Sequence, residues 1–200
     1  FHSLGYRILK AEAESLGRKP NFSVFDEDDS FSLIKNIVKN SEDDMTAPEA
    51  RAKIAYFKNT LVSPENEEAD EANRKSRSVF EKYERRLQEN NAFDFDDLIQ
   101  KTVMLWQNQP QILAKYQNRW RHILVDECQD INRVQYEFIK CLAEKSRSLF
   151  VIGDDAQAIY SFRQADFKHF LNFESDWPGA KVFLLEENYR SSGNIVRAAG

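Results

Sequence analysis

Apolar residues recur at helical spacing through most of the first 120 positions. Leu4, Ile8 and Leu9 lie on one face of a predicted helix, and the same period continues at positions 31/34/38, 80/83/87, 95/98/99/102/106 and 113/116/120. Such a period, with polar residues opposite, is typical of amphipathic helices that pack on a core. We therefore expect this region to be mainly helical, with polar loops at residues 41–48 and 63–71.

Three features predict where these helices begin. The acidic stretch 26–29 precedes the second apolar stripe and suits the positive end of a helix dipole. Asp94 is the last residue of a break at residues 90–94 and is a suitable N-cap for the next helix. Pro110 fits the first turn of the helix after that, because its fixed φ and missing N–H are tolerated there.

The pattern changes after Arg121, where three short, fully apolar runs occupy residues 123–125, 149–152 and 182–185. Runs of this kind are typical of parallel strands buried on both faces. A helix between the first two, with Val134, Phe138, Ile139 and Leu142 inward, completes a βαβ order. In such sheets functional groups gather beyond the carboxyl ends of the strands.

Two acids, Asp126 and Glu127, directly follow the first apolar run. A strand-end Asp can hold Mg²⁺ through its water shell, and an adjacent Glu can take a proton from an attacking water, as nucleoside-triphosphate hydrolysis requires. The alternative is a pair of solvated acids that cap the next helix. Gln129 and Asp130, which follow at once, favour the hydrolytic interpretation.

The other two runs also end in polar clusters. After residue 152 come Gly153 and Gln157, then Tyr160, Phe162 and Arg163; aromatics beside an arginine suit stacked bases and a nearby backbone phosphate, although packing in a core would use the same spacing. After residue 185 come Tyr189, which could stack on a base, and Arg190, which could act as an arginine finger. A surface ion pair of Arg190 with Glu186 or Glu187 is the alternative.

Composition narrows the class of protein. The 200 residues include 15 Phe, 7 Tyr and 3 Trp with 30% charged residues, which predicts a folded, globular chain. No apolar run approaches the length of a membrane helix. Cys128 and Cys141 have neither CxxC spacing nor a partnering histidine, which argues against a disulfide scaffold or zinc site. The net charge of −5 disfavours broad binding of nucleic acid, and only residues 101–150, with 8 basic and 5 acidic residues, are locally basic.

One expected element of a hydrolase is absent from the 200 residues. No GxxxxGK(S/T) occurs in them, and no glycine is followed by lysine. The backbone cradle and the lysine that hold β- and γ-phosphates are therefore missing from this segment. A strand-end Asp-Glu pair without a phosphate loop cannot complete an ATPase site.

The three strand-end clusters, in this order, resemble the UvrD/Rep/PcrA-type superfamily 1 DNA helicases. The matching motifs are LVDExQD, then GDDxQxIYxxR, then LExNYRS, and residues 1–5 resemble a further family segment. The resemblance implies an α/β fold: a RecA-like P-loop NTPase motor domain, with a parallel sheet between helices and a mostly helical inserted subdomain. It places residues 1–10 and 119–182 in the first RecA-like domain, 11–118 in the insertion and 183–200 at the start of the second RecA-like domain.

The resemblance also implies roles for nine residues. Those for ATP are Asp126 holding Mg²⁺, Glu127 as general base, Gln157 and Arg190 at the γ-phosphate, and Tyr189 on the adenine. Those for single-stranded DNA are His2, Tyr160, Phe162 and Arg163. For His2 a helix-capping role is the alternative.

The function implied is that of an ATP-dependent DNA helicase or translocase that moves 3′ to 5′. The cofactors implied are ATP and Mg²⁺, and the substrates are single-stranded DNA and single-strand/duplex junctions. Repair or recombination proteins are possible partners, and the expected location is the cytoplasm or nucleoid. Residues 1–200 alone are expected to be inactive, as an internal piece of a longer enzyme. Two alternatives stay open: the motor of a helicase–nuclease, and a non-catalytic nucleic-acid-binding remnant.

Overall fold

The computed structural model describes residues 1–41, 45–64, 71–154, 157, 172–185 and 187–199. The chain divides into two compact units, residues 1–170 and 171–200. The larger unit holds these elements in chain order: α1 (His2–Ala11), the 3₁₀ turn η1 (Ala13–Leu16), β1 (Ser23–Phe25), α2 (Glu27–Lys39), α3 (Ala47–Thr60), α4 (Glu71–Glu89), β2 (Ala92–Asp94), α5 (Asp97–Asn108), α6 (Pro110–Arg119), β3 (Ile123–Val125), the 3₁₀ turn η3 (Cys128–Asp130), α7 (Arg133–Ala143) and β4 (Leu149–Val151).

The expected helices form, and their starts have identifiable causes. The Asp26 side chain caps α2 by accepting a hydrogen bond from the Asp29 N–H at 2.9 Å, as the acidic stretch predicts. Pro110 opens α6. The cap of α5 differs from expectation, because Asp96 occupies the N-cap position. Asp94, the last residue of β2, still accepts a hydrogen bond from the Asp97 N–H at 2.8 Å. It thereby satisfies one of the backbone N–H groups that have no partner within the first turn of α5.

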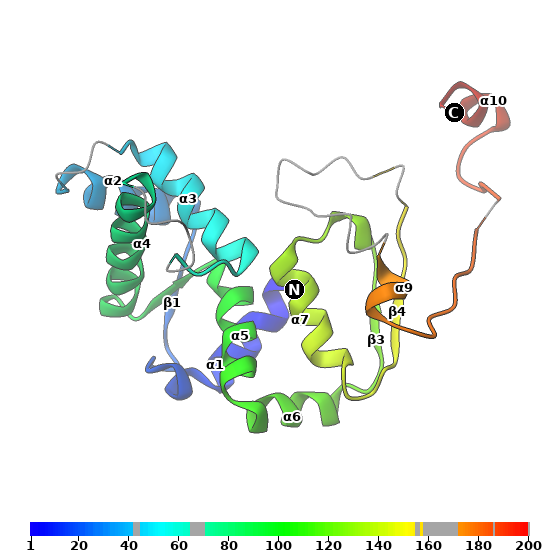
Figure 1. The fold of residues 1–200 in the computed structure, drawn as a ribbon, viewed down its shortest axis with the longest axis horizontal. Helices are drawn as coiled ribbons and strands as arrows, with labels where there is room; N and C mark the ends of the chain where they lie inside the picture. The colour runs from blue at the N-terminus through cyan, green and yellow to red at the C-terminus, as the bar shows by residue number, and fades with distance from the viewer. Residues whose placement is uncertain (42–44, 65–70, 155–156, 158–171, 186, 200) are drawn as a thin grey trace. The chain divides into compact units, whose positions relative to one another are not determined.

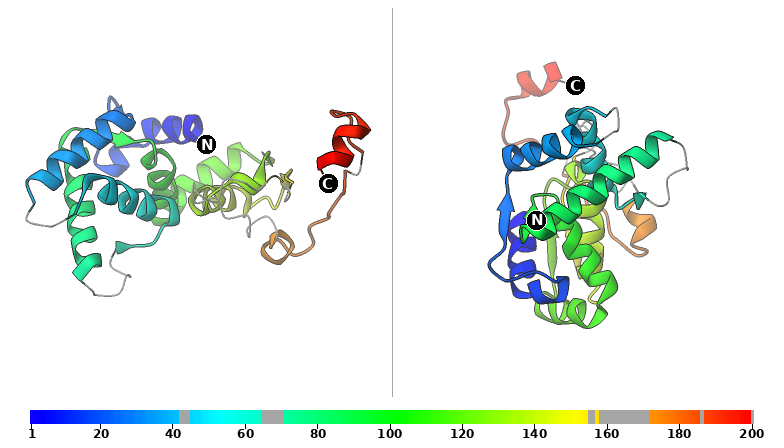
Figure 2. Two further views of the ribbon diagram at one scale, coloured as in Figure 1. Left: turned by 90° about the horizontal axis from the view of Figure 1, so that it is seen from above. Right: turned by 90° about the vertical axis from the view of Figure 1, so that its left-hand side faces the viewer.

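Helices of the larger unit pack around two main apolar centres. One centre lies between α2, α3 and α4 and includes Ile34, Ile54 and Tyr83. The other lies between α1, α5, α6 and α7 and includes Trp106 and Phe138. Figure 1 shows α5 between the α2–α4 group and α7, and Figure 2 shows the same elements from two further directions.

Helices α1 and α5 approach each other very closely at Gly5. A Cβ added there would lie 2.0 Å from the main-chain oxygen of Leu98, a backbone atom that cannot swing aside. Glycine is therefore required at this crossing. The close approach holds the start of the chain against α5, although Leu98 lies 93 positions after Gly5 in the sequence.

Two short parallel strand pairs complete the larger unit, β1 with β2 and β3 with β4. The second pair confirms the strands expected at 123–125 and 149–152, although β4 ends one residue earlier, at Val151. Helix α7 between them buries Val134, Phe138, Ile139 and Leu142 as predicted. The first pair was missed, because Ser23–Phe25 and Ala92–Asp94 each include a polar residue and so form no continuous apolar run. Residues 90–94, expected to be a break, contain β2.

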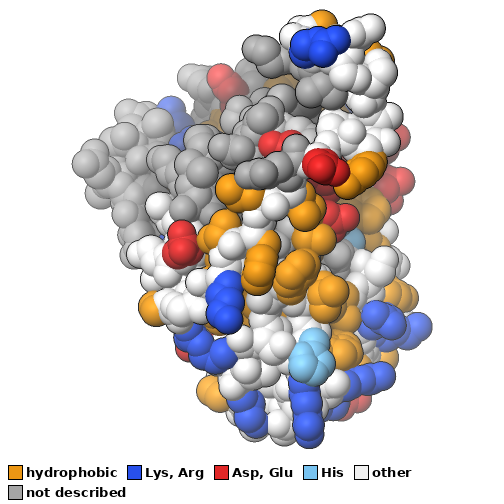
Figure 3. Space-filling view, turned by 90° about the vertical axis from the view of Figure 1, so that its right-hand side faces the viewer, with side chains coloured by type: hydrophobic (Ala, Val, Ile, Leu, Met, Phe, Trp, Pro, Cys, Tyr) orange, Lys and Arg blue, Asp and Glu red, His pale blue; other side chains and the backbone are white. Residues whose placement is uncertain are grey.

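In the described residues these strands are buried on one face only, not on both as expected. In β3 and β4 one face packs on α7, whereas Leu124 and Phe150, paired across the strands, are 75% and 55% exposed. Figure 3 shows apolar side chains gathered on this side of the molecule. The reason is that α7 covers only one face, and among the described residues no element covers the other.

The third predicted strand, at residues 182–185, does not form. These four apolar residues are 63–90% exposed and carry no regular secondary structure. A strand requires a neighbour for its backbone N–H and C=O groups, and the described residues of 171–200 contain only the helices α9 (Phe173–Asp176) and α10 (Gly193–Ala199). In that unit Trp177 is buried, with its ring stacked on Phe173.

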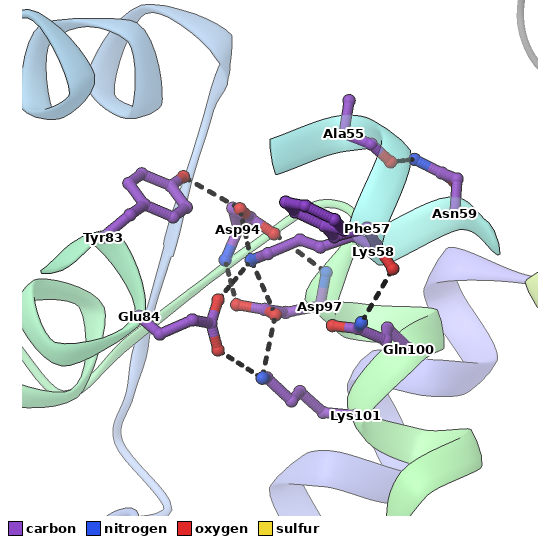
Figure 4. A network of polar contacts seen from close by, with 10 residues as sticks. All are labelled: Ala55, Phe57, Lys58, Asn59, Tyr83, Glu84, Asp94, Asp97, Gln100 and Lys101. Atoms are coloured by element: carbon purple, nitrogen blue, oxygen red, sulfur yellow. Dashed lines mark hydrogen bonds and ion pairs between the residues drawn. The ribbon is translucent and has the colours of Figure 1, made fainter. Parts of the chain in front are cut away.

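A buried ionic cluster joins α3, α4, β2 and α5. We call it the Lys58 cluster; it consists of Lys58, Glu84, Asp94, Asp97 and Lys101. Lys58 is fully buried, and its Nζ lies 2.9, 2.7 and 2.8 Å from carboxylate oxygens of Glu84, Asp94 and Asp97 (Figure 4). Burial lowers the pKa of Lys58, but the three carboxylates outweigh it and hold that pKa well above its usual value. Lys58 therefore stays charged inside the unit.

Among the described residues, no helix is both long and apolar enough to cross a membrane.

Candidate functional site

The candidate site lies at the carboxyl edge of the β3–β4 pair. Because the two strands are parallel, the segments that follow β3 and β4 both leave the sheet at this edge. The pairing continues beyond the strands, since the Ile152 N–H donates to the Val125 oxygen at 2.8 Å and the Cys128 N–H to the Ile152 oxygen at 2.9 Å. The loops that follow the two strands are therefore held side by side.

Glu127 stands on a left-handed turn at the tip of β3. Its φ of 51° and ψ of 45° are uncommon for a residue with a side chain, and such backbones gather at functional sites. The Asp126 Oδ1 accepts a hydrogen bond from the Glu127 N–H at 3.0 Å. Both carboxylates are exposed at this edge of the sheet.

Gln129 connects the two loops and was not assigned a role from the sequence. Its amide is buried, and Nε2 donates to Glu127 Oε2 at 2.8 Å while Oε1 accepts from the Asp154 N–H at 3.1 Å. One side chain thus orients the Glu127 carboxylate and attaches it to the loop after β4. The motif position of Gln129 was visible in the sequence, but Asp154 becomes its neighbour only through the strand pairing.

Gln157 joins the same set of contacts. Its Nε2 donates to Asp154 Oδ2 at 2.6 Å, and its N–H donates to the Asp154 oxygen at 3.1 Å. A continuous series of hydrogen bonds therefore runs from Glu127 through Gln129 and Asp154 to Gln157. The structure brings three of the predicted ATP-site residues, Asp126, Glu127 and Gln157, to one edge.

Two other predicted ATP-site residues, Tyr189 and Arg190, belong to residues 171–200. Tyr189 is 90% exposed, and its hydroxyl donates to the Glu187 carboxylate. The Asn188 side chain accepts from the N–H groups of Arg190 and Ser191, both at 2.9 Å, which forms a tight turn. A site shared by these residues and Glu127 stays a prediction.

His2, predicted to lie near DNA, is exposed on α1 and contacts Phe95. The ring centroids are 6.1 Å apart at an interplanar angle of 82°, an edge-to-face arrangement. Phe95 was expected to continue the apolar stripe of the following helix, yet it is 48% exposed because α5 begins only at Asp97. The other predicted DNA contacts, Tyr160, Phe162 and Arg163, lie outside the described residues.

The donor set at this edge suits a metal ion that arrives with its own ligands. The described residues contain no group of three or more His, Cys, Asp or Glu side chains that could enclose a metal. Asp126 offers one exposed carboxylate, of which only Oδ1 forms a hydrogen bond with the part of the chain that the structure describes. This fits Mg²⁺, which commonly takes one or two carboxylates and completes its shell with water and substrate phosphates.

Cys128 and Cys141 are free thiols. Burial raises the pKa of both thiols, Cys128 and Cys141, to about 11. They are thus protonated near neutral pH and are poor nucleophiles or metal ligands.

A parallel strand pair that presents acids at its carboxyl edge is typical of α/β proteins that bind nucleotides. The model of the UvrD/REP helicase N-terminal domain matches residues 1–178. ATP-dependent DNA helicase PcrA of Staphylococcus epidermidis strain RP62A is 42% identical over 205 aligned positions, and that of Staphylococcus aureus strain Mu50 is 41% identical. Both alignments cover the whole chain and 28% of the relative's length. The chain belongs to the UvrD/REP helicase family.

Proposed function

We propose that the protein containing this chain is an ATP-dependent DNA helicase or translocase that uses ATP and Mg²⁺. The observation that carries this proposal is the edge of the β3–β4 pair, where Glu127 is linked through Gln129 and Asp154 to Gln157 in a member of a helicase family. The helicase names of the relatives support the same activity.

We also propose that β3, α7 and β4 are part of a RecA-like motor domain, with residues 11–118 as a mostly helical insertion and residues from 183 on in a second motor domain. The exposed apolar face of Leu124, Phe150 and Ile152 supports this, because in a RecA-like sheet helices cover both faces. The parallel pairing and its connection through a helix support it as well.

In the proposed mechanism each residue acts from the position described above. Asp126 would hold Mg²⁺, partly through water, and the ion would neutralise charge that develops on the transferred phosphoryl group. Glu127 would take the proton of the attacking water at its carboxylate, which the Gln129 amide orients. Gln157, linked to the same loop, would respond to the γ-phosphate. Arg190 and Tyr189 would contact the γ-phosphate and the adenine from the second domain.

For DNA we propose that His2 and Phe95 form one contact surface. An exposed aromatic ring held edge-to-face by an imidazole offers a face on which a base can stack. Tyr160, Phe162 and Arg163 would contact further nucleotides. Single-stranded DNA and its junctions with duplex are the proposed substrates, 3′ to 5′ the proposed direction, and the cytoplasm or nucleoid the proposed location.

The test of the proposed enzyme uses the full-length protein. We expect Glu127→Gln to lower the steady-state rate of DNA-stimulated ATP hydrolysis by roughly 10²–10⁴-fold, because the general base is lost while the shape of the side chain is kept. Glu144→Gln, which removes another exposed acid, is the matched control and should hydrolyse ATP like the parent. Hydrolysis by Glu127→Gln at the parent rate would refute the assignment. Purified residues 1–200, which contain no phosphate loop, should show no turnover.

The DNA surface is tested by Phe95→Ala in the full-length protein. Loss of one stacked base should weaken binding of single-stranded DNA by about 1–3 kcal/mol, and Phe162→Ala should do the same. The control is Tyr56→Ala, which removes an exposed ring on α3. Equal affinities of parent and Phe95→Ala, measured by fluorescence anisotropy at one salt concentration, would exclude Phe95 from the interface.

A further inference from the structure

A second candidate site lies away from the strand edge, in a cavity of about 410 Å³ bounded by α4, β2, α5 and the loop after η1. Side chains at its wall include Arg18, Phe80, Glu84, Arg85, Phe93 and Lys101. Glu84 and Lys101 are also members of the Lys58 cluster, so the cavity borders that cluster (Figure 4). A volume of this size suits a small organic molecule.

The charges at the cavity wall are unequally satisfied. Glu84 is paired with Lys58 and Lys101, and Glu81, the other acid at the wall, is paired with Arg77 at 2.8 Å. The guanidinium groups of Arg18 and Arg85 make no hydrogen bond or ion pair with the described residues. The acids at the wall are therefore neutralised locally, whereas two cations keep their donors available.

Arg18 is the more informative of the two arginines. It is only 9% exposed, its buried Nε has no hydrogen-bond partner, and its Cζ lies 5.0 Å from the centre of the Phe93 ring. Burial lowers the pKa of Arg18, although the charges of Asp97 and Glu84 oppose this. Leaving donors of a buried cation unpaired costs free energy, so an anion that enters the cavity would gain hydrogen bonds that the protein itself does not provide.

We propose that this cavity binds a small organic anion. Its head is a phosphate or carboxylate that accepts hydrogen bonds from Arg18 and Arg85, because a guanidinium group presents a planar set of donors that matches either head. Its body is apolar or aromatic and packs on Phe80 and Phe93. The ligand would connect α4 to β2 and α5, and it is distinct from the ATP proposed at the strand edge.

The experiment titrates phenyl phosphate into the full-length protein by isothermal calorimetry, with saturating Mg·ADP to fill the proposed ATP site. We expect saturable binding, and we expect Arg85→Gln to weaken it roughly tenfold or more through loss of charge-assisted hydrogen bonds. Arg86→Gln is the matched control. Arg86 is the next residue on α4 but pairs with Glu89 at 3.0 Å and does not line the cavity, so its substitution should leave the affinity unchanged.

Two further probes separate the head from the body. Benzoate in place of phenyl phosphate shows which head is preferred, and binding of either probe that depends on Arg85 supports the proposal. Inorganic phosphate should bind more weakly than phenyl phosphate, because it lacks the apolar body; equal affinity would overturn the packing on Phe80 and Phe93.

The proposal would be overturned if neither phenyl phosphate nor benzoate bound saturably at concentrations up to about 10 mM, because a dissociation constant above that value corresponds to little binding free energy. Identical dissociation constants for parent and Arg85→Gln would do so too. Arg85 is exposed, so its substitution leaves folding intact and the test does not depend on the buried Arg18.

Discussion

Two groups of acidic side chains in residues 1–170 are held in opposite ways. In the Lys58 cluster Asp94 and Asp97 are buried and Glu84 is half-buried, and a carboxylate oxygen of each lies within 2.9 Å of the Lys58 Nζ. At the carboxyl edge of β3, Asp126 and Glu127 are exposed, and the described residues place no cation against them. The first group is neutralised by the fold itself, whereas the second keeps oxygens available.

The difference shows how acids that look alike in a sequence divide between structure and chemistry. A buried charge must be paired, because solvent cannot compensate for it. A carboxylate that binds Mg²⁺ or takes a proton from water must instead keep the lone pairs of its oxygens accessible. Gln129 illustrates the compromise, since it orients Glu127 with one neutral hydrogen bond and adds no opposing charge.

The largest effect on stability is expected from Lys58→Met. Removing the central cation leaves carboxylates without their counter-ion in the interior, which typically costs about 3–5 kcal/mol. Native-state hydrogen exchange of amides in α3 and α5 of the full-length protein would measure the loss. Lys35→Met on the exposed face of α2 is the control and should change stability by no more than about 0.5 kcal/mol. Unchanged protection in Lys58→Met would show that the cluster adds nothing to stability.

A smaller effect is expected from pH, and two members of the cluster contribute with opposite sign. Burial and the neighbouring Asp94 raise the pKa of Asp97 to about 7, above its ordinary value of 3.8. Burial also opposes ionisation of Glu84, but Lys58 and Lys101 outweigh it and lower that pKa to about 2, below the ordinary 4.5. The folded state thus holds the proton of Asp97 more tightly than the unfolded state, and that of Glu84 less tightly.

Linkage converts these shifts into a stability profile. Between about pH 7 and 4, Asp97 makes the free energy of unfolding rise as the pH falls; below about pH 4.5, Glu84 makes it fall again as pH approaches 2. Asp97→Asn should flatten the first slope and keep the second, in hydrogen exchange corrected for the intrinsic rate at each pH. An unaltered slope between pH 7 and 4 would show that Asp97 does not titrate there.

The smallest effect on stability is expected from Glu127→Gln, the variant with the large predicted loss of activity. The carboxylate is exposed, and among the described residues its one partner is the neutral Gln129 amide, so the unfolding free energy should change by about 0.5 kcal/mol or less. Matched hydrogen-exchange measurements on this variant and Lys58→Met would compare the two acidic groups directly. A loss of several kcal/mol in Glu127→Gln would place its carboxylate among the structural charges.

Local patterns in the sequence were sufficient for most helices and for two strands. The apolar period located α1, α2, α4, α5 and α7, and Pro110 marked the start of α6, because these signals depend on neighbours three or four residues away. The apolar runs at 123–125 and 149–152 predicted β3 and β4. The run at 182–185 has the same composition and does not form a strand, because pairing depends on a partner that its own residues do not specify.

The sequence by itself determined the helical faces, the two parallel strands with acids at their tips, and the motifs that resemble the helicase family. Tertiary structure alone decided which charges are buried. Lys58, in the last turn of α3, carries no local sign that three carboxylates from α4, β2 and α5 surround it. Tertiary structure also decided that Gln129 links Glu127 to Asp154, and that the buried Nε of Arg18 lies beside a cavity with no hydrogen-bond partner among the described residues. These features depend on contacts between residues far apart in the chain, and no periodic pattern encodes such contacts.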